Sequence, residues 1–429
     1  MKVALLNPPW RFDHSIYFGC RAPHLLLELA CAKLHLERRG HEALMLDGHL
    51  LGLDAATLAE QTRAFAPDLI VVTTAPSYLF WRCAQPELAV PRDLIDRLRG
   101  EAMIVAVGPH GSTTPGATLR KLDADVVLRG ECDEAVADLA DAAGVPGRVA
   151  GAAWREDGTV RANGAPRVAR FVDLPALAWP DEWIARHRHH HHRFDAEPAG
   201  PGAEVEASRG CPYACTFCAK LDFRDAYRRR ALPPLLAEID ALIAQGVEYI
   251  YFIDEIFLPQ RPLLEALRER PIRFGVQTRI DLWKPEMLDL LGVSGCVSIE
   301  AGVESLTSEG RAALDKKCRL DTDELTALLV RARRTVPFVQ ANLIKSTGDD
   351  AARIAEWRQG LQRQGVWAND PVPLFPYPAS PDYRRLWGEP DEAAWERAHA
   401  HYLAQFDAFS DIQESRPLPL PVLEAACGC

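Results

Sequence analysis

The sequence predicts an α/β protein with two halves, an open parallel sheet covered on both faces and a partial β/α barrel, followed by a small helical tail. Three observations lead to this prediction. The chain has 429 residues, about three times the usual ~150-residue domain. In both halves, short runs that are apolar throughout alternate with amphipathic segments of helical spacing, as in parallel sheets. The apolar fraction of 48% and the charged fraction of 25% are typical of globular proteins.

The first half contains five strand–helix units. The expected strands are Val3–Leu6, Glu42–Leu46, Leu69–Thr73, Ile104–Val107 and Val126–Leu128. The expected helices are His24–Arg38, one from Asp54, one ending near Arg99, a short one, and one from Glu131. Five such units predict a doubly wound, flavodoxin-like domain over residues 1–143.

Ligands of doubly wound sheets bind outside the carboxyl ends of the strands. The candidate binding residues of the first half are therefore those that follow four of its strands. They are Pro8, Pro9, Trp10, Thr74, Ser77, Gly108, Pro109, His110, Gly130 and Glu131.

Residues 144–203 are rich in Gly and Pro, which predicts a linker. The stretch holds a basic run, Arg186–Arg193, with His187 and His189–His192. A His run can bind metal. Since no Cys or carboxylate at ligand spacing accompanies it, we expect a solvated loop.

The second half contains six strand–helix units. The expected strands are Val205–Ala207, Tyr249–Ile253, Phe274–Gln277, Cys296–Glu300, Val339–Ile344 and Val372–Phe375. Six units without a dinucleotide signature predict a partial (β/α)6 barrel over residues 204–375, with its active site at the carboxyl ends of the strands. Residues 376–429 are expected to form a C-terminal extension with one helix, Asp391–Phe406.

Charge and hydropathy exclude several classes of partner. The net charge of −11 disfavours nucleic-acid binding, which needs a positive field. No apolar run approaches the ~18 residues that cross a bilayer, and the apolar N-terminal stretch is too short for a signal peptide. We therefore expect a cytoplasmic, reduced protein with no membrane or nucleic-acid partner. Its 11 cysteines are then thiols or metal ligands, not disulfides.

Three of these cysteines lie on one compact loop directly after the first barrel strand. The loop reads Ser208-Arg209-Gly210-Cys211-Pro212-Tyr213-Ala214-Cys215-Thr216-Phe217-Cys218. Three thiolates at this spacing can bind three irons of a 4Fe–4S cluster and leave the fourth iron open. A tetrahedral zinc site would need a fourth ligand, and no second Cys pair or nearby His supplies it before Cys296.

The other cysteines have plainer interpretations. Six are isolated and are expected to be small packing residues: Cys20, Cys31, Cys83, Cys132, Cys296 and Cys318. Cys427 and Cys429 form a Cys-Gly-Cys terminus that could bind metal or form a disulfide, although a mobile tail is the better expectation.

With this cysteine loop, the sequence resembles the radical S-adenosylmethionine (SAM) enzymes, whose hallmark is a CxxxCxxC loop after the first barrel strand. The first half resembles the cobalamin-binding domain that precedes the barrel in one large branch, the class B methyltransferases among them. The supporting motifs in the first half are Asn7-Pro8-Pro9, Gly108-Pro109-His110 and Arg129-Gly130-Glu131. Weaker similarities in the barrel and tail are Tyr227-Arg228, Phe252–Glu255, Thr278–Asp281, Gly302–Ser305 and Phe375–Pro378.

The resemblance implies roles for residues of the barrel. Cys211, Cys215 and Cys218 would ligate the cluster, whose open iron would chelate the amino and carboxylate groups of SAM. Phe217 occupies the place of an aromatic residue near the adenine. Four residues lie at strand ends where the family contacts SAM or substrate: Gly302 as a cofactor-binding residue, and Arg279, Glu300 and Glu304 as candidate catalytic residues. For each acid, a structural ion pair on the barrel rim is an equally good interpretation.

Two features depart from the family pattern. Lys345–Asp349 stands where the family often has a Gly-x-Pro-Gly turn, so a backbone approach to SAM at that strand is in doubt. Asp47–Gly52 matches the Asp-x-His-x-x-Gly cobalamin motif, but it follows the second strand instead of the first. We interpret the match as coincidence. Cobalamin would then bind without a His ligand from this motif, with its lower face covered by Thr73–Tyr78.

The resemblance implies a cobalamin-dependent radical SAM enzyme. It would methylate an unactivated carbon of a small molecule, such as a sugar or natural product, through a 5′-deoxyadenosyl radical and methylcobalamin. The cofactors would be a 4Fe–4S cluster, SAM and cobalamin, and the electron donor a flavodoxin or ferredoxin. The alternatives are radical cyclisation or rearrangement on the same cofactors and, outside enzymes, a cobalamin-binding regulator. A methylthiotransferase is disfavoured because its N-terminal domain would carry three further cluster cysteines.

Overall fold

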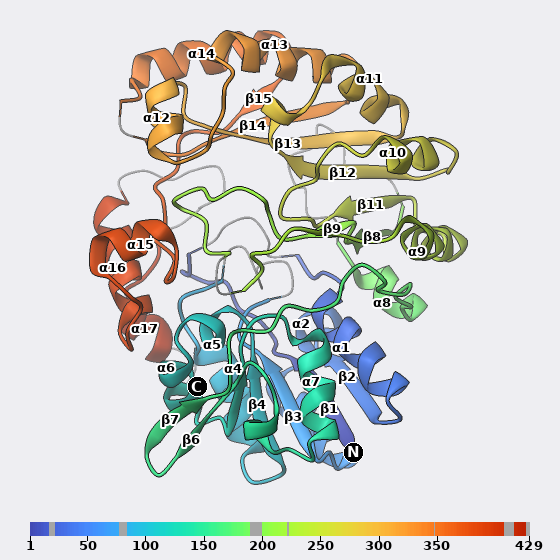
Figure 1. The fold of residues 1–429 in the computed structure, drawn as a ribbon, viewed down its shortest axis with the longest axis vertical. Helices are drawn as coiled ribbons and strands as arrows, with labels where there is room; N and C mark the ends of the chain where they lie inside the picture. The colour runs from blue at the N-terminus through green and yellow to red at the C-terminus, as the bar shows by residue number, and fades with distance from the viewer. Residues whose placement is uncertain are drawn as a thin grey trace.

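The computed structural model describes residues 1–16, 22–76, 84–188, 200–220, 223–346, 348–406 and 416–425. It consists of two sheet-containing halves, with the barrel above and the N-terminal half below in Figure 1. The C-terminal helices run along one side of the molecule, from the barrel to the N-terminal half (Figure 1). The predicted α/β class is confirmed.

The N-terminal half is built on a seven-stranded sheet of order β2-β1-β3-β4-β5-β6-β7. Its first five strands are parallel, and their order is that of flavodoxin-like sheets. Their bounds are β1 Lys2–Asn7, β2 Glu42–Asp47, β3 Leu69–Thr73, β4 Met103–Val107 and β5 Val126–Leu128.

Successive side chains of these strands point to opposite faces of the sheet and fill a hydrophobic core on each face. Val3 and Leu5 pack in the core on one face, and Ala4 and Leu6 in the core on the other. The first face is covered by α1 (Leu27–Arg38) and α7 (Cys132–Asp141). The other face is covered by α3 (Ala55–Phe65), α4 (Ala89–Leu98) and α6 (Pro115–Leu122). Two short helices follow strand ends: α2 (Gly48–Leu51) and α5 (Pro109–Thr113).

Part of the expected linker belongs to this sheet. β6 (Ala152–Glu156) pairs antiparallel with β5, and β7 (Thr159–Ala162) pairs with β6 across a two-residue turn. The turn residues Asp157 and Gly158 have φ of 49° and 75°, as a tight hairpin requires. The 3-10 turn Pro146–Arg148 and helix α8 (Asp181–Arg186) complete the stretch. The expected boundaries at 143 and 203 stay predictions, and His189–His192 lie outside the described residues.

The second half is a six-stranded parallel sheet in which neighbours in sequence are neighbours in space. Its strands are β8 Gly202–Val205, β11 Tyr249–Phe252, β12 Arg273–Thr278, β13 Cys296–Glu304, β14 Phe338–Leu343 and β15 Trp367–Ala368. Its helices are α9 Leu232–Ala244, α10 Arg261–Arg268, α11 Pro285–Val293, α12 Ser308–Ala313, α13 Thr322–Arg333 and α14 Ala351–Arg363, with a 3-10 turn at Ile280–Leu282.

Two barrel strands differ from the prediction. The first ends at Val205, so residues 206 and 207 already lie beyond it. The last is only two residues long, and Val372, where a strand was expected, makes a single bridge to Ile344. The Pro residues 371 and 373 explain this interruption, because Pro donates no ladder hydrogen bond.

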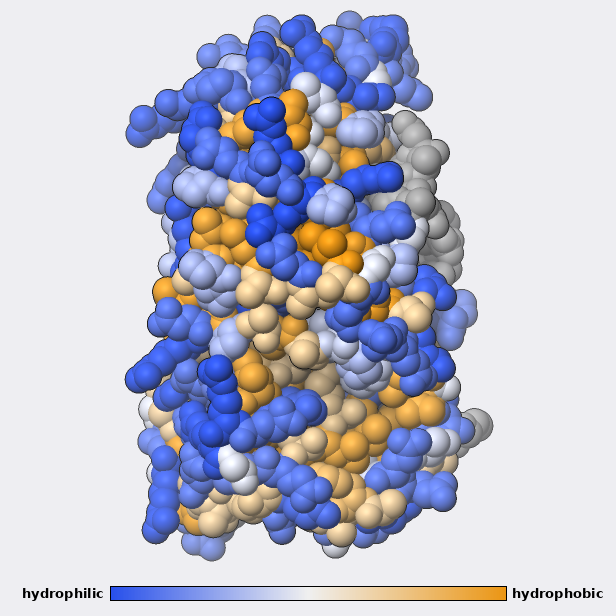
Figure 2. Space-filling model, turned by 90° about the vertical axis from the view of Figure 1, so that its right-hand side faces the viewer, coloured by the Kyte–Doolittle hydropathy of each residue, from blue (hydrophilic) through white to orange (hydrophobic). Residues whose placement is uncertain are grey.

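The C-terminal extension contains three described helices where one was expected: α15 (Pro381–Trp387), α16 (Ala394–Gln405) and α17 (Leu420–Ala425). Trp395 and Tyr402 of α16 are buried in a core of the N-terminal half. Figure 2 shows one side of the molecule, with a mostly hydrophilic barrel end and apolar atoms gathered over the middle and lower parts. Within the described ranges, no helix combines the length and apolar character needed to span a bilayer.

Candidate functional site

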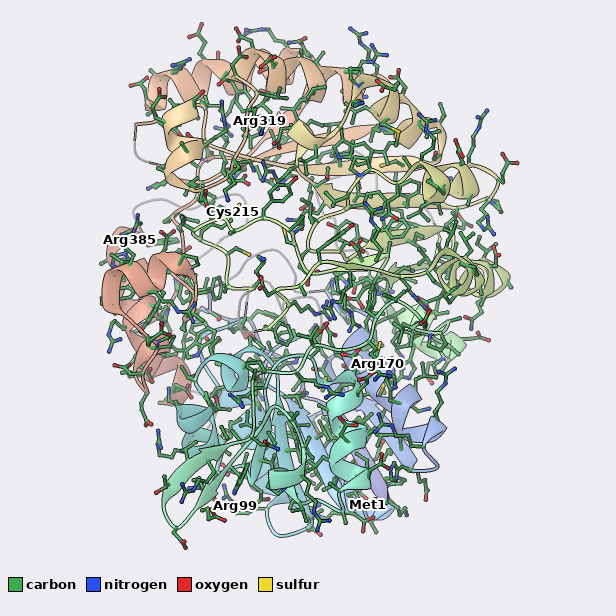
Figure 3. The ribbon with its side chains drawn as sticks, viewed as in Figure 1. Met1, Arg99, Arg170, Cys215, Arg319 and Arg385 are labelled. Carbon is green, nitrogen blue, oxygen red and sulfur yellow. The ribbon has the colours of Figure 1, made fainter. Side chains whose placement is uncertain are left out.

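The cysteine loop lies between the two halves of the molecule, as the position of Cys215 in Figure 3 shows. Its two ends are joined by a short antiparallel pair, β9 (Ser208–Arg209) and β10 (Arg228–Arg229). Gly210 has φ of 74°, and a Cβ there would stand 2.2 Å from the Ala226 carbonyl oxygen, so the turn requires glycine.

Three further contacts hold the loop in place. The Gly210 N–H donates to Glu255 at 2.8 Å, and the Lys220 ammonium donates to the Cys211 carbonyl at 2.7 Å. On the other side of the loop, the Thr216 N–H donates to the Leu314 carbonyl at 3.0 Å. The loop is therefore fixed by groups from the barrel and by its own lysine.

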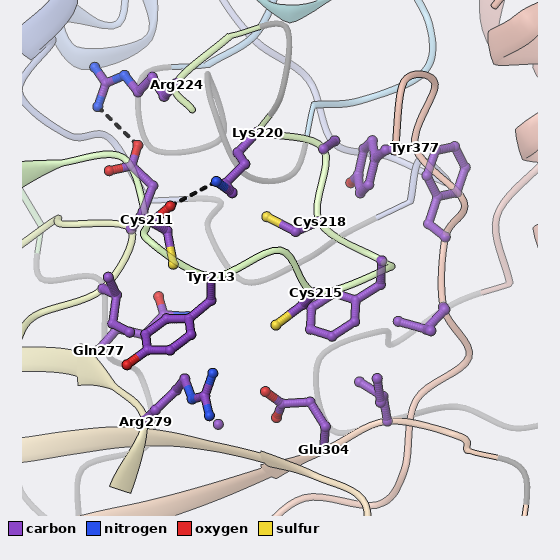
Figure 4. A pocket seen from close by; sticks show the side chains of 18 of the residues that line it. Cys211, Tyr213, Cys215, Cys218, Lys220, Arg224, Gln277, Arg279, Glu304 and Tyr377 are labelled. Atoms are coloured by element: carbon purple, nitrogen blue, oxygen red, sulfur yellow. Dashed lines mark hydrogen bonds and ion pairs between the residues drawn. The ribbon is translucent and has the colours of Figure 1, made fainter. Parts of the chain in front are cut away.

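The sulfur atoms of Cys211, Cys215 and Cys218 face a common space (Figure 4). Burial raises the pKa of Cys218 to about 12 and also raises the pKa values of Cys211 and Cys215, so metal binding would have to displace thiol protons. No three His, Cys, Asp or Glu side chains in the described part of the chain converge as ligands of one ion. A 4Fe–4S cluster needs no such convergence, because each thiolate binds a different iron, and this donor set fits it.

A cavity of about 330 Å³ opens beside the three sulfurs, a volume suited to a small ligand. The carboxyl ends of the barrel strands form one side of it, with Gln277, Arg279, Gly302 and Glu304. The rest of the lining is largely apolar and aromatic, with Phe217 from the cysteine loop and the residues Ile344, Val372, Leu374, Phe375 and Tyr377.

Arg279 is oriented by two neighbours. Its guanidinium donates to both carboxylate oxygens of Asp281, at 3.1 and 2.7 Å, and lies 4.2 Å from the ring centre of Tyr213. A bidentate pair combined with a cation–π contact leaves a guanidinium little freedom. The third barrel strand thus presents a fixed cation at the cavity.

Glu304 is held in an unusual backbone conformation at the end of β13. Its φ is 67°, which is rare for a residue other than glycine and occurs often at functional sites. The carboxylate accepts from the ammonium of buried Lys316 at 2.6 Å. It lies against Gly302, where a Cβ would stand 2.6 Å from the Glu304 oxygen. The missing side chain at position 302 therefore makes room for the Glu304 carboxylate.

The structure brings most predicted barrel residues together. Arg279, Gly302, Glu304, Phe217 and the three loop cysteines line the cavity. Glu300, also on β13, is not one of its lining residues. Sequence reasoning missed the other polar groups, which are Tyr213, Lys220, Arg224, Glu255, Gln277 and Lys316. Glu255 could have been found from the sequence, because it follows the second barrel strand. Lys316 and Arg224 are brought to the site only by tertiary folding.

The predicted cofactor residues of the N-terminal half divide into two groups. Pro8, Pro9 and Trp10 follow β1, and the Trp10 indole donates to Asn7 at 2.7 Å. The Thr74 hydroxyl after β3 is buried without a described hydrogen-bond partner, so a ligand at this sheet edge could satisfy it. Gly108, with φ of 126°, and Pro109 begin α5, while Ser77 lies outside the described residues.

The second group makes contacts with other parts of the chain. The His110 ring is stacked 4.1 Å from Trp395, and burial lowers its pKa to about 3, so it is uncharged at neutral pH. Gly130 faces the backbone of Arg167, where a Cβ would stand 2.2 Å from a carbonyl oxygen. Glu131 accepts from Arg228 at 2.7 and 3.1 Å and from Arg209 at 3.3 Å. Gly130 and Glu131 thus make internal contacts that the sequence did not predict, whereas both nitrogens of the His110 ring are buried without a described hydrogen-bond partner. A role of these three residues in cofactor binding stays a prediction.

Comparison with known proteins identifies the second half. Residues 205–357 match the family model of the Radical SAM superfamily. An uncharacterized methyltransferase from Pyrococcus horikoshii is 25% identical over 320 residues, which are 71% of this chain and 66% of that protein. The anaerobic magnesium-protoporphyrin IX monomethyl ester cyclase of Cereibacter sphaeroides is 24% identical over 410 residues, 87% of this chain and 63% of the cyclase. The matched stretch therefore spans slightly less than two thirds of these relatives.

Two solved structures share the fold of both halves. The radical S-adenosylmethionine methyltransferase TsrM from Kitasatospora setae, with cobalamin and a [4Fe-4S] cluster bound, superposes with a TM-score of 0.71. That match has 20% identity and covers 89% of this chain and 76% of TsrM. The cobalamin-dependent radical enzyme OxsB, with aqua-cobalamin bound, gives a TM-score of 0.65 at 17% identity, over 80% of this chain and 49% of OxsB. At these identities the likeness is one of fold.

Proposed function

We propose that this chain, which carries a radical SAM domain over residues 205–357, is a cobalamin-dependent enzyme that methylates a carbon atom of a small molecule. The observation that carries the proposal is the placement of three cysteine sulfurs around one space, at the mouth of a cavity formed by the barrel strand ends. Cys211, Cys215 and Cys218 would ligate the cluster. When bound, the cluster would supply the electron that cleaves SAM, and cobalamin the methyl group.

The remaining cavity residues would bind and orient SAM. Gly302 leaves space for the Glu304 carboxylate, which Lys316 holds in place as an acceptor for hydroxyl or ammonium groups. Arg279 offers a fixed cation to a carboxylate, since Asp281 and Tyr213 orient it. Phe217, Phe375 and Tyr377 give the cavity an apolar wall that would exclude water from a reactive intermediate.

For cobalamin, we propose the carboxyl edge of the N-terminal sheet. The fold is that of two proteins whose structures contain cobalamin, and the buried Thr74 hydroxyl at this edge has no described partner. The residues predicted to bind cobalamin are Pro8, Pro9, Trp10, Thr74, Ser77, Gly108, Pro109, His110, Gly130 and Glu131. The domain limits, with residues 1–143 for cobalamin, 144–203 as connection, 204–375 as barrel and 376–429 as extension, belong to this proposal. So do the flavodoxin or ferredoxin donor and the cytoplasmic location.

One observation favours a second candidate. The cyclase of Cereibacter sphaeroides aligns over 87% of this chain, so radical cyclisation or rearrangement on the same scaffold is the alternative. Product mass separates the two reactions, because methylation adds one CH2 unit and cyclisation does not.

The test begins with anaerobic reconstitution of the full chain with iron and sulfide. We expect about four irons per chain and, with dithionite and SAM, release of 5′-deoxyadenosine. Incubation with methyl-labelled SAM, cobalamin and cell extract should then yield a product that carries the label. Iron below about one per chain, or SAM left intact by the reduced protein, would overturn the proposal.

A further inference from the structure

Arg209, two residues before the first cluster cysteine, is fully buried at the junction of the two halves. Its guanidinium donates to Glu206 of its own half at 2.9 and 2.7 Å. It also donates to Asp133 at 2.6 Å and to Glu131 at 3.3 Å, both at the start of α7 in the N-terminal half. The Phe171 ring lies 4.6 Å from the guanidinium carbon. One side chain thus joins the cysteine loop to a helix of the other half.

Arg224 extends this contact back to the loop. It donates to Glu206 at 2.6 Å and lies 3.4 Å from Glu255, the residue that accepts the Gly210 N–H. It also lies 3.6 Å from Glu28 of α1. Buried acidic side chains of both halves and the first turn of the cysteine loop therefore form one continuous set of polar contacts.

Stability alone does not explain such a cluster. Removing charges from water costs several kcal/mol per ion, and apolar side chains of similar volume often hold a protein interior together as well. A planar guanidinium between fixed carboxylates instead gives each hydrogen bond a defined direction. Burial raises and Arg209 lowers the pKa of Asp133, with a net lowering, so this carboxyl is ionised and holds the guanidinium as a charged pair.

We propose that Arg209 is a positioning residue, which fixes the place of Cys211 relative to the N-terminal half through Asp133 and Glu131. The inference rests on the proposed function, because the position of Cys211 matters for catalysis only if Cys211 ligates the cluster. It predicts that a charge on α7, outside the radical SAM domain, controls the order of the cluster-binding loop. Only Gly210 separates Arg209 from Cys211 in the chain, and the Gly210 N–H donates to Glu255. A shift of Arg209 would therefore be passed directly to Cys211.

The test compares two substitutions on the same helix. Asp133→Asn removes the charge of one of the three buried carboxylates that pair with Arg209, the one on α7 that accepts at 2.6 Å. Asp138→Asn removes a partly exposed aspartate of α7 that pairs with Arg39 at 2.6 Å. Hydrogen exchange is measured by mass spectrometry on the full chain without iron. We expect amides of residues 208–220 to exchange at least ~10-fold faster in Asp133→Asn, with no change in Asp138→Asn.

A second readout uses the reconstituted protein. Arg209→Lys keeps the charge but loses the planar fork, so we expect an altered EPR signal of the reduced cluster while Asp138→Asn keeps the wild-type signal. Unchanged loop exchange in Asp133→Asn, or equally faster exchange across the whole chain, would overturn the inference. If Arg209→Lys does not fold, Asp133→Asn alone decides. A wild-type chain that binds no iron would refute the proposed function while leaving the exchange result standing.

Discussion

The ion pair between Lys316 and Glu304 can be measured with three variants, Lys316→Met, Glu304→Gln and the double substitution. The ammonium and carboxylate atoms are 2.6 Å apart, and the Lys316 side chain is 1% exposed. At an effective dielectric constant of ~20, two unit charges at this distance attract by about 6 kcal/mol. Solvent screening at the Glu304 carboxylate, whose side chain is 12% exposed, and relaxation in the variants reduce this attraction, whereas the desolvation of each single group cancels in the cycle. We therefore expect a net coupling energy of about 2 kcal/mol.

Each single substitution should lower the free energy of unfolding by more than the coupling energy of the pair. Lys316→Met leaves the Glu304 carboxylate beside Gly302 without its cation, and loss of one partner from a buried pair costs about 3–5 kcal/mol. The double variant should cost clearly less than the sum of the two single variants. The free energy of unfolding is measured by urea titration of the reduced chain without iron, and variants with an unchanged urea slope are compared.

A surface pair provides the control. Arg331 of α13 and Asp289 of α11 form an ion pair whose side chains are 38% and 40% exposed. The same cycle there, with Arg331→Met and Asp289→Asn, should give a coupling energy below about 1 kcal/mol. If the Lys316–Glu304 coupling is no larger than that of the control, the reasoning about the buried pair is wrong.

Three further predictions concern the cluster, the pH dependence and the tail. Cys211→Ala should reduce bound iron from about four per chain to below about one, whereas Cys318→Ala should keep it, as an iron assay will show. Burial raises the pKa of Glu28 from 4.5 to about 8, so its stabilising contribution is full below pH 4.5 and is lost as the pH rises to 8. Glu28→Gln should therefore gain up to ~5 kcal/mol over the wild type across this range in urea unfolding, and a pH-independent difference would contradict this. Trp395→Ala should destabilise the chain by about 3–5 kcal/mol and speed proteolytic release of the tail, whereas Trp387→Ala, at a half-buried position, should cost less.

The fold could be predicted where local pattern decides structure. Apolar runs located β3 and β5 to the residue, and Asp54 marked the start of α3 because its side chain caps the helix. The hairpin β6–β7 was missed because its glycines and polar turn resemble those of a linker, although the Asp157-Gly158 pair is a hairpin signal.

The site could be predicted only where its residues are close in sequence. The spacing of the cysteines predicted the loop, and the resemblance to the radical SAM enzymes pointed to Arg279, Glu300 and Glu304 at strand ends, of which Arg279 and Glu304 line the cavity. Lys316 reaches Glu304 from a loop with no motif of its own, so tertiary folding alone reveals the pair. His110 follows a strand end as a ligand-binding residue would, and only the folded structure reveals that Trp395, far along the chain, stacks on its ring.

The position of Trp395 has a consequence for how the protein is made. Its indole donates to Thr114 across 281 residues of sequence, and the Glu424 carboxylate accepts from the Leu88 N–H across 336. Residues of α16 complete a core whose strands emerge first from the ribosome. During synthesis that core keeps an uncovered apolar surface until α16 has been translated. Contacts this distant also slow folding, since the long intervening chain has to be closed first. Until then, the exposed apolar surface makes the nascent N-terminal half prone to aggregation.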